Sequence, residues 1–175
     1  MKVTTSHEIL VFDYPRQRQL LHSLGGLLEN YPDCQGRRTN VKATMTEWDF
    51  DIKNLEFIEW KRYLISKIKE LNLFYGNPFE FESLWANIYR RGDHTISHDH
   101  DPFRYSIVYF LKSKPNFSPL VFENKGLRKK KTIKPIEGRI VIFPGFIKHS
   151  VPRHNHDETR ITLSGNLNHE SRRHN

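Results

Sequence analysis

The stretch EGRIVIFPGFIKHSVP, residues 137–152, is the most informative one for the fold of this chain. Its apolar run, residues 140–143, has the length and the β-branched side chains of a buried strand. Pro144 and Gly145 end that run, and the chain then reaches His149. The stretch therefore predicts a strand that ends in a turn and delivers a histidine.

Short alternating runs of the same kind fill the chain from Phe79 onward, and Gly, Pro and Asn separate them. Closely spaced short strands are typical of antiparallel sandwiches and barrels. We therefore expect a barrel in the second half of the chain. Its predicted strands are residues 81–90, 106–111, 120–122, 132–136, 139–143 and 160–167.

The first half of the chain has helical patterns instead. Leucines recur at helical spacing within residues 15–30, and residues 55–71 carry an apolar stripe opposite a charged face. The polar residues 31–40 between them contain Pro32 and Gly36 and are typical of a loop. The chain is therefore expected to have helices first and an antiparallel β-region afterwards.

The length of 175 residues suits one domain with one core. We predict that residues 1–78 are mainly helical support and lid, and that residues 79–168 form the barrel core with its site. No stretch approaches the roughly 18 apolar residues of a membrane span, and the N-terminus lacks the features of a signal peptide. The expected location is the cytoplasm.

Cys34 is the only cysteine, so any metal ion must be held by His, Asp or Glu. The formal net charge of +8 raises the question of nucleic-acid binding, because Lys and Arg release counterions from phosphate. Much of that charge lies in one predicted turn between Lys125 and Lys134 and in the tail at Arg172 and Arg173. A solvated loop accounts for such runs more simply, so nucleic-acid binding is possible but not favoured.

The histidines are clustered in two segments. His98 and His100 are two residues apart, so in an extended strand both imidazoles point to one face and reach the same ion. His149 is the third candidate, because a barrel brings distant strands together. Three ligands on one side of an ion leave the opposite positions open for substrate and oxygen, as redox iron chemistry requires. The three histidines are therefore predicted to form a metal site.

One alternative for the ligand set stays open. The strand alternation fails if the segment turns at Pro102, and a carboxylate from Asp99 or Asp101 is then a possible ligand. His98 and His100 alone would also be consistent with surface histidines beside a turn, and it is the addition of His149 that favours a metal site.

Residues 85–168 resemble the 2-oxoglutarate and Fe(II)-dependent oxygenases, in particular a compact branch common in bacteria and phages. The resemblance implies an α+β fold, a double-stranded β-helix (a jelly-roll or cupin-like barrel) with N-terminal helices packed on it. Four blocks follow the order of that family: WANIYRRGD, SHDHDPFRYSIVYFL, IKPIEGRIVIFPGFIKHSVP and RITLSGNLN.

The resemblance also implies a 2-oxoglutarate site around Arg160. Arg160 follows His149 by eleven residues and Thr162 lies two residues further on, which matches the family's pair that holds the far carboxylate of 2-oxoglutarate. A guanidinium group suits this role because it binds a carboxylate through two hydrogen bonds. Tyr89 matches the position whose hydroxyl adds a hydrogen bond to the same carboxylate.

Two amides are further candidates for the cofactor pocket. Asn166 shares the strand face of Arg160 and Thr162, and Asn87 shares the strand parity of Tyr89. Both side chains are therefore expected to line the cavity.

The implied activity is that of a dioxygenase that uses Fe(II), 2-oxoglutarate and molecular oxygen, hydroxylates an unidentified substrate, and releases succinate and carbon dioxide. One departure is that most of the superfamily has His-x-Asp where this chain has His98 and His100. A cupin-like metalloprotein with three histidines and no 2-oxoglutarate is therefore one alternative. A nucleic-acid-binding module that uses the basic loop is another.

Overall fold

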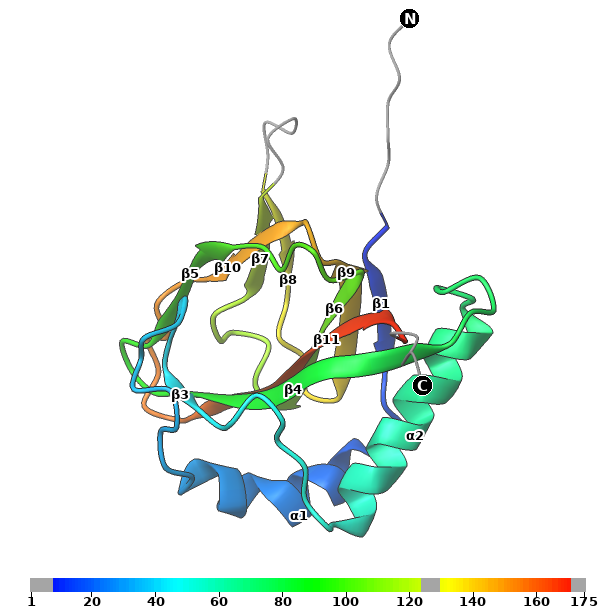
Figure 1. Cartoon of the computed structure of the whole chain (residues 1–175). Helices are drawn as coiled ribbons and strands as arrows, with labels where there is room; N and C mark the ends of the chain where they lie inside the picture. Colours follow the sequence, from blue (N-terminus) through cyan, green and yellow to red (C-terminus); the bar gives the residue numbers. More distant parts are fainter. Residues whose placement is uncertain (1–7, 124–129, 171–175) are drawn as a thin grey trace, which may run out of the picture.

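A computed structural model gives the fold and describes residues 8–123 and 130–170. The described residues form two helices and eleven strands, and the strands make two antiparallel sheets that face each other (Figure 1). Both helices lie beneath the larger sheet, on its side away from the smaller one. The predicted combination of antiparallel β-structure and helices is confirmed.

The larger sheet has β11 near its centre, paired on either side with β4 and β6. The register of β11 and β4 sets Arg160 opposite Tyr89 and Thr162 opposite Asn87. Among the described residues this sheet has six strands in the order β1 (Leu10–Asp13), β9 (Arg139–Pro144), β6 (Tyr105–Lys112), β11 (Arg160–His169), β4 (Phe79–Tyr89) and β3 (Thr44–Met45).

The smaller sheet carries two of the histidines on neighbouring strands. His98 is the last residue of β5, and it lies opposite His149 of β10. Within the described ranges this sheet has five strands in the order β2 (Val41–Lys42), β5 (His94–His98), β10 (Lys148–Val151), β7 (Leu120–Glu123) and β8 (Lys131–Ile133).

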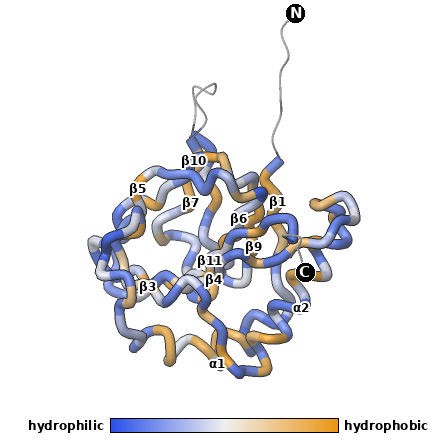
Figure 2. Tube along the Cα trace, in the orientation of Figure 1, coloured by the Kyte–Doolittle hydropathy of each residue, from blue (hydrophilic) through white to orange (hydrophobic). Residues whose placement is uncertain are grey.

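The helices are α1 (Gln17–Glu29) and α2 (Leu55–Glu70), close to the predicted segments. Asn54 caps α2, because its side chain accepts a hydrogen bond from the backbone N–H of Phe57. The leucines of α1 and the aromatic and aliphatic residues of α2 bury one face of each helix against the larger sheet. Figure 2 shows the apolar segments in both helices and in the central strands. Neither helix in the described ranges is both long and apolar enough to cross a membrane.

Strand alternation divides the larger sheet into two faces with different neighbours. On β6, Tyr109 and Leu111 pack in the core shared with the helices, whereas Val108 and Phe110 belong to the cluster between the two sheets. The inner cluster also contains residues of the smaller sheet, such as Phe122. The space between the sheets is therefore a separate interior, and the candidate site lies there.

The expected order of helices first and strands afterwards is wrong in one respect. Strands β1, β2 and β3 precede residue 79 and join the two sheets at their edges. The strand β8 is also shorter than predicted, since it ends at Ile133, two residues before Pro135. Such short strands are defined by distant pairing partners and carry little periodicity of their own.

Candidate metal centre and adjoining cavity

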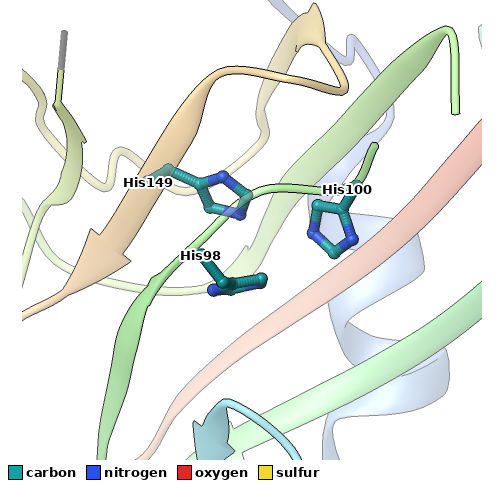
Figure 3. A group of neighbouring side chains, drawn as sticks. All are labelled: His98, His100 and His149. Atoms are coloured by element: carbon teal, nitrogen blue, oxygen red, sulfur yellow. The ribbon is translucent and has the colours of Figure 1, made fainter. Parts of the chain in front are cut away.

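Three histidine side chains from two segments of the chain meet between the sheets. One nitrogen each from His98, His100 and His149 lies within 4.8 Å of the others, and this is the group of potential metal ligands found in the described part of the chain. Their ring centroids are 4.5–5.1 Å apart. Figure 3 shows the rings grouped around a common space. The structure thus brings together the three histidines that the sequence predicted.

Backbone contacts orient two of the three imidazoles. The Nδ1 atom of His98 is 2.8 Å from the carbonyl oxygen of Ile96, and that of His149 is 3.1 Å from the carbonyl oxygen of Ile147. A carbonyl accepts a hydrogen bond, so Nδ1 carries the proton in both rings. The lone pair is then on Nε2, and this is the arrangement by which proteins orient metal-binding histidines.

His100 reaches the group by a different route from the one expected. It lies beyond the end of β5, so strand alternation does not place it beside His98. Its backbone N–H donates to the carbonyl oxygen of Gly145 at 2.7 Å, which docks the segment on the connection before β10. The segment does turn, which is the condition that left Asp99 and Asp101 open as ligands, but among the described residues the group contains neither carboxylate.

Burial keeps the histidines neutral, as metal ligands must be. Desolvation, with smaller contributions from the neighbouring imidazoles, lowers the pKa of His149 to about 3 and that of His100 to about 4. Desolvation also lowers the pKa of His98. Neutral imidazole binds iron, zinc, nickel and copper, so the residues present fit a divalent transition metal.

A cavity adjoins the histidines and runs between the sheets toward Arg160. Its walls include all three imidazoles at one end and Arg160, Tyr89 and Thr162 at the other. Trp85 and Phe143 give the histidine end apolar walls, because their ring centroids lie 6.0 Å from that of His100 and 4.8 Å from that of His149, respectively.

Arg160 is the most unusual residue of the cavity, because its charged side chain is fully buried. Within the described ranges, none of its three guanidinium nitrogens makes a hydrogen bond. The guanidinium carbon lies 4.6 Å from the ring centroid of Tyr89 and 5.2 Å from that of Phe110. Burial lowers the pKa of Arg160 and the neighbouring Tyr89 hydroxyl acts in the opposite direction, and a guanidinium remains charged in proteins. An unpaired buried cation is costly, so this end of the cavity is suited to an anion.

The other residues predicted around Arg160 form a polar network on the cavity wall. The amide nitrogen of Asn87 donates to the hydroxyls of Thr162 at 3.3 Å and Ser164 at 3.1 Å. The indole N–H of Trp85 donates to the amide oxygen of Asn87 at 3.0 Å. The network fixes the orientation of Asn87 and leaves the carbon atoms of Trp85 facing the cavity.

Thr95 is a cavity residue that the sequence analysis missed. Its hydroxyl lies 2.7 Å from the hydroxyl of Tyr89, and both residues line the cavity near Arg160. Thr95 lies three residues before His98, and in a regular strand that spacing points the two side chains to opposite faces, so strand parity argued against Thr95. A register shift between Thr95 and His98 in the pairing with β10 removes that regularity.

Asn166 lies apart from the predicted cofactor pocket. Its amide oxygen accepts a hydrogen bond from Ser106 at 2.9 Å, and its amide nitrogen donates to Ser83 at 3.1 Å. Ser106 lines the cavity, whereas Asn166 is not among the lining residues. The contacts favour a role in orienting Ser106.

The basic loop is only partly described. Three of its basic residues lie outside the described residues, namely Lys125, Arg128 and Lys129. The same holds for Arg172 and Arg173 of the C-terminal tail. Lys130 pairs with Glu123 at 2.7 Å. Nucleic-acid binding by this segment stays an untested prediction.

Residues 122–166 match the model of a family described as "Putative 2OG-Fe(II) oxygenase". The match begins at the last two residues of β7 and includes His149 and the segment from Arg160 to Asn166. No curated protein matches the chain in sequence.

Several solved structures share the fold. A prolyl-4-hydroxylase from Pseudomonas putida is 15% identical with a TM-score of 0.71, and the match covers 94% of each chain. HygX from Streptomyces hygroscopicus, with nickel, 2-oxoglutarate and hygromycin B bound, is 7% identical with a TM-score of 0.70, over 93% of this chain and 83% of HygX. A Trichoplax adhaerens prolyl hydroxylase, in complex with a hypoxia-inducible-factor peptide, is 14% identical with a TM-score of 0.68, over 93% and 84%.

Because the sequence identities are low, these structural similarities show a shared fold and nothing more. Together with the family model, they confirm the predicted resemblance to the 2-oxoglutarate and Fe(II)-dependent oxygenases. Fe(II) and 2-oxoglutarate, the cofactors predicted from the sequence, are those that the description of the matching family names.

Proposed function

We propose that this protein is an Fe(II)- and 2-oxoglutarate-dependent oxygenase that hydroxylates a substrate and releases succinate and carbon dioxide. The observation that supports this most directly is the unpartnered, fully buried guanidinium of Arg160 in the same cavity as three clustered histidines. One end of the cavity suits a metal ion and the other suits a carboxylate. 2-Oxoglutarate carries both matching groups, a 2-oxo acid for the metal ion and a second carboxylate for the guanidinium.

Several finer features belong to the same proposal. The two facing sheets would be the double-stranded β-helix, or jelly roll, of these oxygenases. Residues 1–175 would form one oxygenase domain, with residues 79–168 as its core and residues 1–78 as support and lid. We also propose a cytoplasmic location.

His98, His100 and His149 would hold the iron. Their imidazoles are neutral, and those of His98 and His149 are oriented by backbone carbonyls. With iron and 2-oxoglutarate bound, the centre supplies the activation of molecular oxygen that C–H hydroxylation needs. His98 and His149 would contribute no acid or base step, because backbone carbonyls hold their Nδ1 protons.

The residues at the other end of the cavity would bind and orient the cosubstrate. The Arg160 guanidinium would pair with the far carboxylate of 2-oxoglutarate, and the Thr162 and Tyr89 hydroxyls would add hydrogen bonds. Asn87 holds Thr162 in place, and Thr95 does the same for Tyr89. Trp85 and Phe143, which pack beside His100 and His149, would exclude water from the histidine end.

An anaerobic titration tests this function. Addition of Fe(II) and then 2-oxoglutarate to the metal-free protein is expected to produce the visible charge-transfer band of the chelate. Arg160→Ala should weaken the dependence of that band on 2-oxoglutarate. Arg139→Ala is the matched control, because it removes a guanidinium that pairs with Asp13 outside the cavity. Absence of the band in the parent protein would contradict the cofactor assignment.

One observation favours a second candidate function. The residue at the usual carboxylate position is His100, and three histidines are the ligand set of some cupin-like dioxygenases that use no cosubstrate. Tight Fe(II) binding without any 2-oxoglutarate binding would favour that class. The unpaired charge of Arg160 argues against it, since such an enzyme has no need of a buried cation beside its metal.

A further inference from the structure

Gly145 occupies a position where no side chain fits. A Cβ atom at residue 145 would lie 2.1 Å from the carbonyl oxygen of Phe103 and 3.3 Å from that of His100. Both neighbours are backbone atoms, which cannot rotate away as a side chain does. The φ angle of Gly145 is outside the left-handed region, so the requirement for glycine comes from space alone.

The close approach is used for a pair of backbone hydrogen bonds. The carbonyl oxygen of Gly145 accepts from the N–H of His100 at 2.7 Å, and the N–H of Gly145 donates to the carbonyl oxygen of Arg104 at 3.2 Å. The turn closes on itself through the N–H of Phe103, which donates to the carbonyl oxygen of His100 at 2.8 Å. The backbone N–H of Arg104, at the end of the same turn, donates to the carbonyl oxygen of Leu167 in β11 at 3.1 Å.

These contacts connect two histidines that no strand pairing connects. His149 follows Gly145 by four residues, and His100 starts the turn that docks on Gly145. The His100 and His149 ring centroids are 5.1 Å apart. Metal–imidazole bonds of roughly 2.0–2.1 Å leave little tolerance for a ligand displaced along its backbone.

We propose that Gly145 is a positioning residue that holds His100 at metal-binding distance from His98 and His149 before any metal binds. The proposal rests on the proposed function only in that the three histidines hold a metal ion. Because residue 145 has no side chain, the backbone of His100 can approach it and form a hydrogen bond with its carbonyl oxygen. This hydrogen bond replaces the strand pairing that His100 lacks.

Gly145→Ala tests this with Co(II) as the metal probe. We expect binding of Co(II) to weaken about 10- to 100-fold, the usual cost of losing a group that supports a metal ligand. The visible d–d spectrum should also change, because one ligand shifts relative to the others. A role in stability alone would lower the melting temperature of the metal-free protein and leave the spectrum unchanged.

Gly138→Ala is the matched control, since Gly138 lies just before the other end of β9. Its φ is +87° and a Cβ there would lie 2.8 Å from Cγ of Gln17, so alanine should destabilise the fold as well. It has no contact with a histidine of the group, so Co(II) affinity and spectrum should equal those of the parent. Equal affinity and spectrum in Gly145→Ala would overturn the proposal.

A second measurement needs no variant and decides the matter if Gly145→Ala does not fold. In the metal-free parent, the backbone N–H of His100 should be protected from hydrogen exchange by its bond to Gly145. Exchange at the rate of an unprotected amide would overturn the proposal. Failure of the parent to bind Co(II) would instead contradict the proposed function, so the two failures are distinguishable.

Discussion

The two ends of the cavity are built in different ways. Arg160 lies on β11, a ten-residue strand that pairs with β4 along its length and with β6 from Ile161 to Leu167, and the register with β4 sets Arg160 opposite Tyr89. The histidine end is assembled from two short strands and a turn, β5, β10 and residues 100–104. A regular sheet tolerates loss of one side chain without moving its neighbours, whereas the turn depends on single contacts. Substitutions should therefore act locally at the Arg160 end and spread further at the histidine end.

The largest effect is expected from His149→Ala. Removal of one of three ligands should weaken Co(II) or Fe(II) binding by more than about 100-fold, beyond the usual loss from a supporting group. Calorimetric titration of the metal-free protein measures this. His156→Ala is the control, because His156 is outside the cluster and contacts the carbonyl of Asn116. Retained affinity in His149→Ala would remove that residue from the ligand set.

Arg160→Leu should separate binding from stability. Loss of a bidentate, charge-assisted contact is expected to weaken 2-oxoglutarate binding by about 10- to 100-fold. The ligand-free protein should become more stable by about 1 kcal/mol or more, because an unpaired buried cation is replaced by an apolar side chain. Titration of the metal-loaded protein with 2-oxoglutarate measures the expected loss of affinity, and thermal unfolding of the ligand-free protein measures the expected gain in stability. A less stable ligand-free variant would mean that Arg160 has a partner of its own.

Thr95→Val should have a smaller effect at the same end. The hydroxyl of Tyr89 loses its hydrogen-bond partner, and an unsatisfied buried hydroxyl costs about 1–3 kcal/mol. We expect a lower melting temperature and a loss of 2-oxoglutarate affinity below tenfold, with Co(II) affinity unchanged. A changed Co(II) spectrum would show that the two ends are not independent.

The smallest effect is expected at Glu29, whose hydrogen bonds connect α1 to the segment next to Arg160. Glu29 bonds to Lys112 and to Thr159, the neighbour of Arg160, and these hydrogen bonds lower the pKa of its carboxyl. A lowered folded-state pKa gives stability that is present above the usual carboxyl range and is lost as the pH falls through the folded-state value. Glu29→Gln should lose less than about 1 kcal/mol at neutral pH, because the pair is partly exposed. Unfolding curves of both proteins should converge in acid, and a constant difference at all pH values would contradict this account.

The Arg160 end was predictable from sequence because regular alternation carries the information. The resemblance to the oxygenases selected Arg160, Thr162 and Tyr89, and a strand period of two places Arg160 and Thr162 on one face, opposite Tyr89 and Asn87. Once β11 and β4 pair, the same rule places Arg160, Thr162 and Ser164 at the cavity, whereas Asn166, next to a register shift, is not among the lining residues. Those strands were also long enough to be recognised by their periodicity.

The histidine end was predictable in its residues but not in its construction. His100 was selected for strand parity, whereas a backbone bond to Gly145 brings it to the group. Thr95 was missed because a register shift separates it from His98. The roles of Thr95 and Gly145 come from contacts between segments about 50 residues apart or across an irregular pairing, and spacing along the chain does not reveal these.

The two-faced character of β11 has a practical consequence for redesign. Ile161, Leu163 and Leu167 belong to the core shared with the helices, while Thr162 and Ser164 face the cavity. A combinatorial library at the cavity-facing positions would vary what the cavity accepts and leave the helix-packed layer as it is. Selection for new chemistry and selection for foldability can therefore be run on alternate residues of one strand.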